Sequence, residues 1–288
     1  MTPSTCSIVS WNCFGAAQNP VAFFRWKGAP NAHRFRHPAL RSALSEEDIL
    51  CFQELFLGDA EELFDALPMA HKIRDHNRTL WWPLTIGGSG LGVASRHPIV
   101  ESSIRAFSPP HVSSERFARK GMLHVTVKVD DTELDVITTH LQSGEGKGPR
   151  RVRLRHLAEV RARVDELSEH GRAVVLCGDF NIDGRAGVRG AEYTHLQKCL
   201  PDFEDLGAPD DAITYHPHPT HNLLAHRYDQ GAPEQRLDYV FFRGPKRGPK
   251  VEVVSMERIF DAVLEAHGGF GETHASDHFA LRVKLRVG

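Results

Sequence analysis

Short apolar runs recur along the chain, and most have the length and pattern of β-strands. MLHVTVKV at 122–129 and LRVKLRV at 281–287 alternate apolar and polar residues, which indicates sheets with one solvated or helix-covered face. Strands are expected over 7–11, 48–53, 90–95, 122–129, 134–139, 173–178, 237–242, 251–256 and 279–287.

Helical periodicity is clearest in PRRVRLRHLAEVRARVDELSEHG at 149–171. Pro149 lies near its start, Gly171 follows its end, and its arginines are expected mainly on a solvated polar face. Its apolar residues recur every three or four positions, at Leu154, Leu157, Val160, Val164 and Leu167. Because strands outnumber helices and no internal repeat is visible, two packed sheets flanked by helices fit better than a regular βαβ array.

Composition limits the possible classes of protein but does not identify one. The chain has 288 residues and no Pro/Gly/Ser-rich boundary, so we expect one domain over 1–288 and a monomer. The chain has 35 Lys and Arg residues and 37 Asp and Glu residues, and this near-neutral balance does not indicate a polyanionic partner. No apolar run approaches the roughly 20 residues that cross a bilayer. The sequence as it stands predicts a cytoplasmic protein, or a secreted one if a signal peptide has been removed.

The five cysteines, Cys6, Cys13, Cys51, Cys177 and Cys199, show no C-x-x-C spacing and mostly lie inside apolar runs. We interpret them as reduced thiols in the core.

Polar residues gather at the ends of the predicted strands. Since strand ends of a packed sheet converge on one edge, they are expected to form a single polar site. They are Asn12, Gln53, Glu54, His140, Gln142, Asp179, Asn181, Asp238, Ser276, Asp277 and His278.

These residue types favour hydrolysis of a phosphate ester with a hard divalent cation. The oxygen ligands Glu54, Asp179, Asp277 and Asn12 suit Mg²⁺, with Mn²⁺ as a substitute, whereas the absence of thiolate clusters and of H-E-x-x-H argues against a zinc site. Donors to the developing charge are available in His140, His278 or Lys120. Asp238 is available to orient His278, and Asp179 to orient water.

Seven motifs carry a resemblance that spans 8–287: IVSWNCFG, ILCFQE, SGLGVASRHPI, TTHLQSG, LCGDFNID, RLDYVF and SDHFAL. Their order resembles the endonuclease/exonuclease/phosphatase superfamily, the pancreatic-DNase-like fold. The resemblance implies an α/β protein, a four-layer α-β-β-α sandwich with two packed, mostly antiparallel sheets.

The resemblance also implies roles for the polar residues. Asn12, Glu54 and Asp277 would lie at the metal, and His140 would contact the scissile phosphate. Asp179 would orient or deprotonate the attacking water, which Asn181 would hold. His278, oriented by Asp238, would act as base or polariser, and the sequence leaves open whether it or Asp179 takes the proton.

The branch of the superfamily is indicated by three features. ERFARKGMLHVTV, with Lys120 before the Gly that opens a strand, resembles the S/A-x-K-G segment of sphingomyelinases, and WNCFG and HLQSG resemble that branch as well. They favour a sphingomyelinase or phospholipase C-type phosphodiesterase acting on a phospholipid head group. A DNA or RNA endonuclease or exonuclease, an inositol-phosphate phosphatase and a non-catalytic binding module on the same fold are the alternatives.

Two further features concern the substrate. Asn222 in THNLLAH resembles a family segment that lines the substrate pocket, although a turn-forming role is an alternative. Peripheral membrane contact could use the aromatic residues of TLWWPL and VAFFRWKG, for which core packing is the other interpretation. These residues are Phe23, Phe24, Trp26, Trp81 and Trp82.

Overall fold

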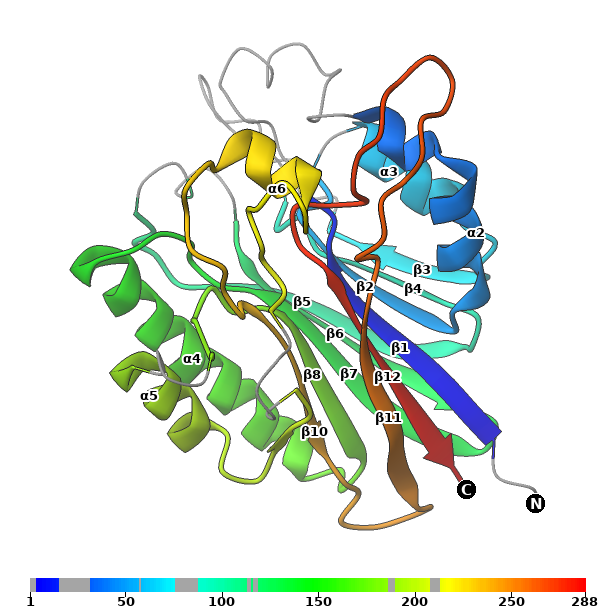
Figure 1. Cartoon of the computed structure of the whole chain (residues 1–288). Coiled ribbons are helices and arrows are strands. Elements are labelled where there is room, and N and C mark those ends of the chain that lie inside the picture. Colours follow the sequence, from blue (N-terminus) through cyan, green and yellow to red (C-terminus); the bar gives the residue numbers. More distant parts are fainter. Residues whose placement is uncertain are drawn as a thin grey trace.

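Two six-stranded sheets pack face to face, and helices cover both outer faces (Figure 1). A computed structural model describes residues 4–15, 32–56, 58–75, 88–112, 115, 119–185, 190–207 and 213–288. The aromatic residues proposed for membrane contact lie outside these ranges. The arrangement confirms the expected α/β sandwich of two mostly antiparallel sheets.

The first sheet, which we call sheet A, has the strand order β11-β12-β1-β2-β4-β3. Its strands are β1 (Ser4–Asn12), β2 (Ile49–Gln53), β3 (His71–Arg74), β4 (Gly92–Ser95), β11 (Val251–Ile259) and β12 (Ala280–Val287). β1 and β2 are parallel, and the other pairs are antiparallel. The 3₁₀-helix η1 (Ala32–Arg36) and the helix α2 (Pro38–Glu46) lie in the connection between the parallel strands.

The second sheet, sheet B, has the order β5-β6-β7-β8-β10-β9. It consists of β5 (Ile99–Ala106), β6 (Gly121–Val129), β7 (Thr132–His140), β8 (Ala173–Asp179), β9 (Glu204–Asp205) and β10 (Asp238–Arg243). Here β7 and β8 form the parallel pair, joined by α4 (Lys147–Ser168). The remaining helices are α3 (Gly58–Ala66), α5 (Ala191–Cys199) and α6 (Leu223–Tyr228).

Three large apolar clusters hold the layers together. One lies between the sheets and contains residues of both, among them Ile8, Val93, Val125, Val175 and Val283. The second packs η1, α2 and α3 on sheet A through residues such as Phe35, Leu44 and Phe64. The third packs α4 and α5 on sheet B. Each sheet is therefore apolar on both faces, which is why its central strands are buried along nearly their whole length.

The long helix differs from its prediction in one respect. Arg153 and Arg163 are buried rather than solvated: Arg153 forms a two-pronged ion pair with Glu192, and Arg163 pairs with Glu166. Guanidinium groups enter the protein interior where carboxylates and carbonyls satisfy them.

The interpretation of the cysteines as reduced core thiols is confirmed for four of them. All five are free, and Cys6, Cys13, Cys51 and Cys177 are buried. Cys199, at the end of α5, is half-buried.

Candidate active site

The predicted polar residues meet at one edge of the sandwich, where the parallel strands of both sheets end. We call this edge the rim. In sheet B, His140 is opposite Asp179, and Asp179 is opposite Asp238. In sheet A, Asn12 is opposite Gln53, and Glu54 follows directly. The polar residues converge because both parallel pairs run toward the rim.

Close packing of β8 against β7 brings the sheet B residues together. Gly178 has φ +140°, and a Cβ at this position would lie 1.9 Å from the carbonyl oxygen of Thr139. Only glycine fits there, directly before Asp179. Glu54 and Asn181, which follow the ends of β2 and β8, adopt left-handed φ angles of 58° and 52°. Such non-glycine conformations are unfavourable and are concentrated at functional sites.

Asn12 joins the two sheets across the rim. Its side-chain Nδ2 donates to Glu54 Oε1 at 3.2 Å and to Asp179 Oδ2 at 3.0 Å. His140 Nε2 lies 3.3 Å from the same Asp179 oxygen and 4.0 Å from Glu54 Oε1. Four of the predicted residues thus share one set of contacts.

Asp179 is held as a carboxylate. Its Oδ1 accepts a hydrogen bond from the Asn181 backbone N at 2.9 Å, while Oδ2 faces Asn12 and His140. Burial alone would raise its pKa, but His140, His278 and Lys120 outweigh burial and lower it. The group is therefore ionised near neutral pH and able to accept a proton or orient water.

Asp238 fixes the orientation of His278. The Nδ1 of His278 lies 2.7 Å from Asp238 Oδ2, and its Nε2 lies 4.0 Å from Asp179 Oδ2. Burial lowers the pKa of His278, but Asp238, Asp277 and Asp179 raise it well above its usual value. Burial, together with the nearby Asp179, raises the pKa of Asp238. An imidazole held in this way presents Nε2 toward Asp179 and the cleft.

The acidic residues of the rim fit a divalent cation. Burial, together with the neighbouring Glu54, raises the pKa of Asp277 to about 7. Carboxylates crowd in this way where a cation compensates their charge, and their oxygens are hard donors. Asp179, Asp238 and His278 also place one ligand atom each within 4.8 Å of one another. Glu54, Asp277 and the Asn12 amide are the residues that would hold the ion.

Two predicted substrate-binding residues lie behind the site. Lys120 is 2% exposed, and its Nζ contacts His140 Nε2 at 2.9 Å and donates to Leu141 O at 2.6 Å. Asn222 is fully buried: its Oδ1 caps α6, and its Nδ2 donates to Ser276 O and Asp277 O at 3.0 and 3.2 Å. Neither side chain lines the cleft, so Lys120 positions His140, and Asn222 positions the segment that carries Asp277.

Arg34 and Tyr215 belong to the rim but had no signal in the sequence analysis. Arg34, fully buried, donates to the carbonyl oxygens of Ala275, Cys13 and Phe14, which ties the end of β1 to the segment before β12. The ring of Tyr215 is tilted against that of His278, with centroids 5.2 Å apart. A buried Arg in a short 3₁₀-helix and a Tyr in a loop segment have no periodicity that would distinguish them from surface residues.

A cleft of about 970 Å³ opens at the rim. Glu54, His140, Asp179, Asn181 and His278 line it, so the predicted catalytic residues other than Asp238 reach its surface. The lining also includes two exposed cations at the start of α4, Lys147 and Arg150. Asn12 and Asp238 do not line the cleft but hydrogen-bond to residues that do, Asn12 to Glu54 and Asp179 and Asp238 to His278.

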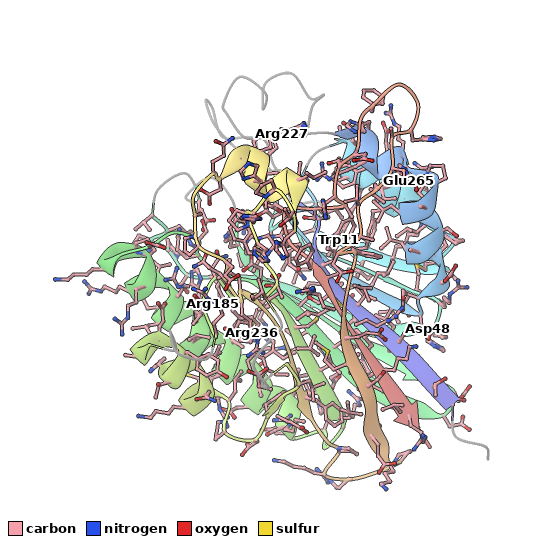
Figure 2. The ribbon with its side chains drawn as sticks, in the orientation of Figure 1. Trp11, Asp48, Arg185, Arg227, Arg236 and Glu265 are labelled. Carbon is pink, nitrogen blue, oxygen red and sulfur yellow. The ribbon has the colours of Figure 1, made fainter. Side chains whose placement is uncertain are left out.

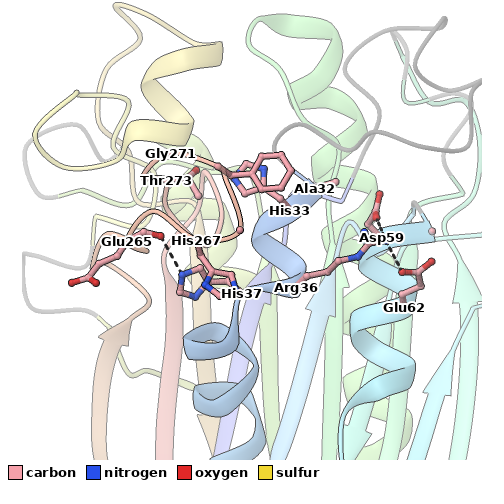
Figure 3. Close-up of a pocket in the computed structure, with 13 residues that line it drawn as sticks. Ala32, His33, Arg36, His37, Asp59, Glu62, Glu265, His267, Gly271 and Thr273 are labelled. Carbon is pink, nitrogen blue, oxygen red and sulfur yellow. Dashed lines mark hydrogen bonds and ion pairs between the residues drawn. The ribbon is translucent and has the colours of Figure 1, made fainter.

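A second pocket of about 670 Å³ lies between η1, α3 and the segment before β12 (Figure 3). Arg36 forms ion pairs there with Asp59 and Glu62. The ring of His33 stacks on that of Phe270, with centroids 4.2 Å apart. None of the predicted site residues lines this pocket, so we place the chemistry in the cleft at the rim.

Comparison with known sequences places the motifs in a family. The family described as Endonuclease/Exonuclease/phosphatase matches residues 9–278. Sphingomyelinase C of Leptospira interrogans is 23% identical over 258 residues, which cover 83% of this chain and 44% of that protein. Sphingomyelinase C of Bacillus cereus is 24% identical over 221 residues, 68% of this chain and 64% of that protein. The chain thus spans less than two thirds of the length of either relative.

Solved structures share the fold at low identity. SmcL has a TM-score of 0.74 at 19% identity, with 99% of each chain covered. A beta toxin mutant from Staphylococcus aureus with bound magnesium ions has a TM-score of 0.72 at 18% identity, covering 97% of this chain and 99% of that one. TDP2 of D. rerio in complex with a single-strand DNA product has a TM-score of 0.70 at 20% identity, covering 98% and 99%.

Proposed function

The chain belongs to the endonuclease/exonuclease/phosphatase family, and from this premise we propose that it is a Mg²⁺-dependent phosphodiesterase of the sphingomyelinase type. Its substrate would be a phospholipid, cleaved so that the phosphorylated head group is released. The relatives named sphingomyelinase C support this choice of substrate, and the bound magnesium in the beta toxin structure supports the choice of ion.

The observation that carries the proposal is the pairing of Asp179 with His278 at the cleft. Asp179 Oδ2 and His278 Nε2 are 4.0 Å apart, and each is fixed by partners on its other side. A carboxylate and an imidazole at this distance can act on one water and one phosphoryl group together.

In the proposed reaction, water attacks phosphorus directly, and no covalent enzyme intermediate forms. Asp179 orients the water and accepts its proton, while Asn181 fixes the Asp179 carboxylate through its backbone N. His278 donates from Nε2 to the developing negative charge, and its raised pKa supports this role over that of base. His140, positioned by Lys120, would contact the scissile phosphate.

A bound Mg²⁺, or Mn²⁺ in its place, would neutralise charge on the phosphoryl oxygens. Glu54, Asp277 and Asn12 would hold it. The role of Glu54 is supported by its left-handed backbone and by the hydrogen bond that its carboxylate accepts from Asn12 at the rim.

A nuclease is the second candidate, because TDP2 with its DNA product shares the fold. Lys147 and Arg150 in the cleft would suit further phosphates of a nucleic acid.

None of the described helices has the length and apolar character to span a bilayer.

The test compares two substrates under two metal conditions. Purified protein is assayed with Mg²⁺ and with EDTA for phosphocholine release from sphingomyelin vesicles and for nicking of supercoiled plasmid. The Asp179→Asn variant serves as the matched inactive control. We expect Mg²⁺-dependent phosphocholine release that the variant lacks. Nicking alone would transfer the chain to the nuclease candidate, and activity that persists unchanged in EDTA would overturn the metal assignment.

A further inference from the structure

Three potential metal ligands converge at the end of sheet A opposite the rim. Cys6 lies near the start of β1, Asp48 directly precedes β2, and His97 lies in the connection from β4 to β5. The Cys6 Sγ, a carboxylate oxygen of Asp48 and a ring nitrogen of His97 all lie within 4.8 Å of one another. We propose that these residues form a second metal site, suited to Zn²⁺ and separate from the catalytic centre.

The site is remote from the chemistry at the rim. Cys6 precedes Asn12 by six residues on the same strand, so at roughly 3.3 Å per residue they are about 20 Å apart. Figure 2 shows Asp48 at the far end of β1 from Trp11, which neighbours Asn12. The proposal is therefore independent of the proposed function.

His97 supplies an observation that points to a ligand. Its Nε2 is shut off from solvent and has no hydrogen-bond partner among the described residues. The backbone of His97 is fixed, since its N donates to Ser95 Oγ at 3.0 Å and its carbonyl oxygen accepts from that hydroxyl at 2.8 Å. A buried imidazole nitrogen without a partner is costly, and a bound cation would satisfy it.

Asp48 and Cys6 are also arranged to present ligand atoms. Asp48 Oδ2 accepts from Ser7 N at 2.8 Å and from Ser7 Oγ at 3.2 Å, which fixes the carboxylate. Among the described residues, these bonds to the Asp48 carboxylate both use Oδ2, so Oδ1 is left for a ligand. Cys6 is fully buried, and its Sγ has only a long contact of 3.9 Å with Ser7 O in the described part of the chain.

The donor set selects the ion. A thiolate, an imidazole and a carboxylate are typical of Zn²⁺, whereas Mg²⁺ takes oxygen ligands alone. Zinc bonds of about 2.0–2.3 Å in a tetrahedron separate ligand atoms by roughly 3.3–3.7 Å, so the groups need to approach by about 1 Å. Water would complete the tetrahedron.

Binding would be linked to a proton. The Cys6 thiol releases its proton when it binds the ion, and the two negative ligands then balance the ion's charge. Burial, and then the neighbouring Asp48, raise the pKa of this thiol in the metal-free protein.

The bound ion would link β1, the residue that precedes β2 and the connection that follows β4. β1 and β2 belong to sheet A, and the connection through His97 leads into sheet B. The expectation from the sequence that the chain has no zinc site rested on clustered motifs, but these ligands are far apart along the chain.

Cobalt titration tests the proposal directly. The protein is stripped with chelator, saturated with Mg²⁺ to occupy the oxygen-rich rim, and titrated with Co²⁺. We expect a sulfur-to-cobalt charge-transfer band that saturates at one equivalent and disappears when Zn²⁺ is added. Zn²⁺ should also raise the melting temperature of the wild type.

Variants identify the ligands. Cys6→Ser should abolish the charge-transfer band, and His97→Ala should weaken Co²⁺ binding at least tenfold. Cys199→Ser, which removes a half-buried thiol elsewhere, should leave the band intact. A band that persists in Cys6→Ser, or that is absent from the wild type, would overturn the site. His97→Ala changes a half-buried residue of a connection, so it tests the site even if Cys6→Ser folds poorly.

Discussion

Two buried histidines of the described residues, His278 at the rim and His156 on α4, respond to burial in opposite ways. His278 at the rim lies against the carboxylates of Asp238 and Asp179, which raise its pKa well above the usual value despite its burial. His156 on α4 stacks on Phe107 at 4.0 Å, and neither of its ring nitrogens has a hydrogen-bond partner among the described residues. Burial, followed by nearby cationic groups, lowers the pKa of His156 to about 3.

The comparison shows that burial alone does not make a histidine functional. A low-dielectric environment disfavours the charged ring, and only carboxylate partners reverse this effect. The environment of His278, which lines the cleft, favours the charged ring, whereas that of His156, packed between α4 and sheet B, favours the neutral ring.

Removing the rim histidine should have the largest effect. We expect His278→Ala to lower kcat by about 10³-fold, because the donor to the developing charge is lost. Steady-state kinetics on the preferred phosphodiester, with thermal melting of the same samples, measures this. Near-normal turnover in a variant that melts like the wild type would contradict the assignment of His278.

Replacing the other histidine should change acid stability but not turnover. The folded-state pKa of His156 is depressed, so the stability it permits is complete above about pH 6.5 and is lost as pH falls toward 3. Between pH 7 and pH 4 this loss is roughly 3 kcal/mol as an upper value. His156→Phe, which can keep the stack on Phe107, should remove most of that dependence.

Urea unfolding at both pH values measures the free energy of unfolding of each protein. The difference between wild type and variant isolates His156 from the carboxylates, which titrate in both proteins. Equal losses of stability on acidification would show that His156 is not a buried neutral base.

Changing the partner of the rim histidine should have the smallest effect. Asp238→Asn keeps a hydrogen-bonding side chain but removes the charge that raises the pKa of His278. We expect kcat to fall about tenfold at neutral pH and the alkaline limb of the rate profile to move to lower pH, since the imidazolium loses its proton earlier. A profile that keeps its alkaline limb would assign the limb to another group.

The sequence predicted the strands well where burial on both faces or clear alternation marked them. β3, β5 and β9 were missed: β3 is a four-residue edge strand, β9 is an edge strand of two residues, and β5, also at an edge, is half-exposed with a weak pattern. The short helices were missed because one to three turns carry little periodicity.

The part of the site that lies at strand ends could be predicted from the sequence. Asn12, His140 and Asp179 are the last residues of their strands, Glu54 follows β2, and His278 lies just before β12, so their meeting at the rim follows from topology. Lys120 and Asn222 were predicted to bind substrate, but a motif does not show which way a side chain points, and neither lines the cleft. Arg34 depends on loops brought together only by tertiary packing.

The parallel strand pair of each sheet contributes a similar set of side chains to the site. β1 and β7 each end in a nitrogen-bearing side chain, Asn12 and His140, and the strands beside them lead to Glu54 and Asp179. Each sheet therefore contributes a half-site, and the hydrogen bond from Asn12 to Asp179 spans the seam. Activity in such an arrangement depends on the distance between the two sheets at the rim. Slight opening of the seam would separate the half-sites while each helix-covered sheet stays intact, so inactivation by heat or denaturant should precede the loss of secondary structure.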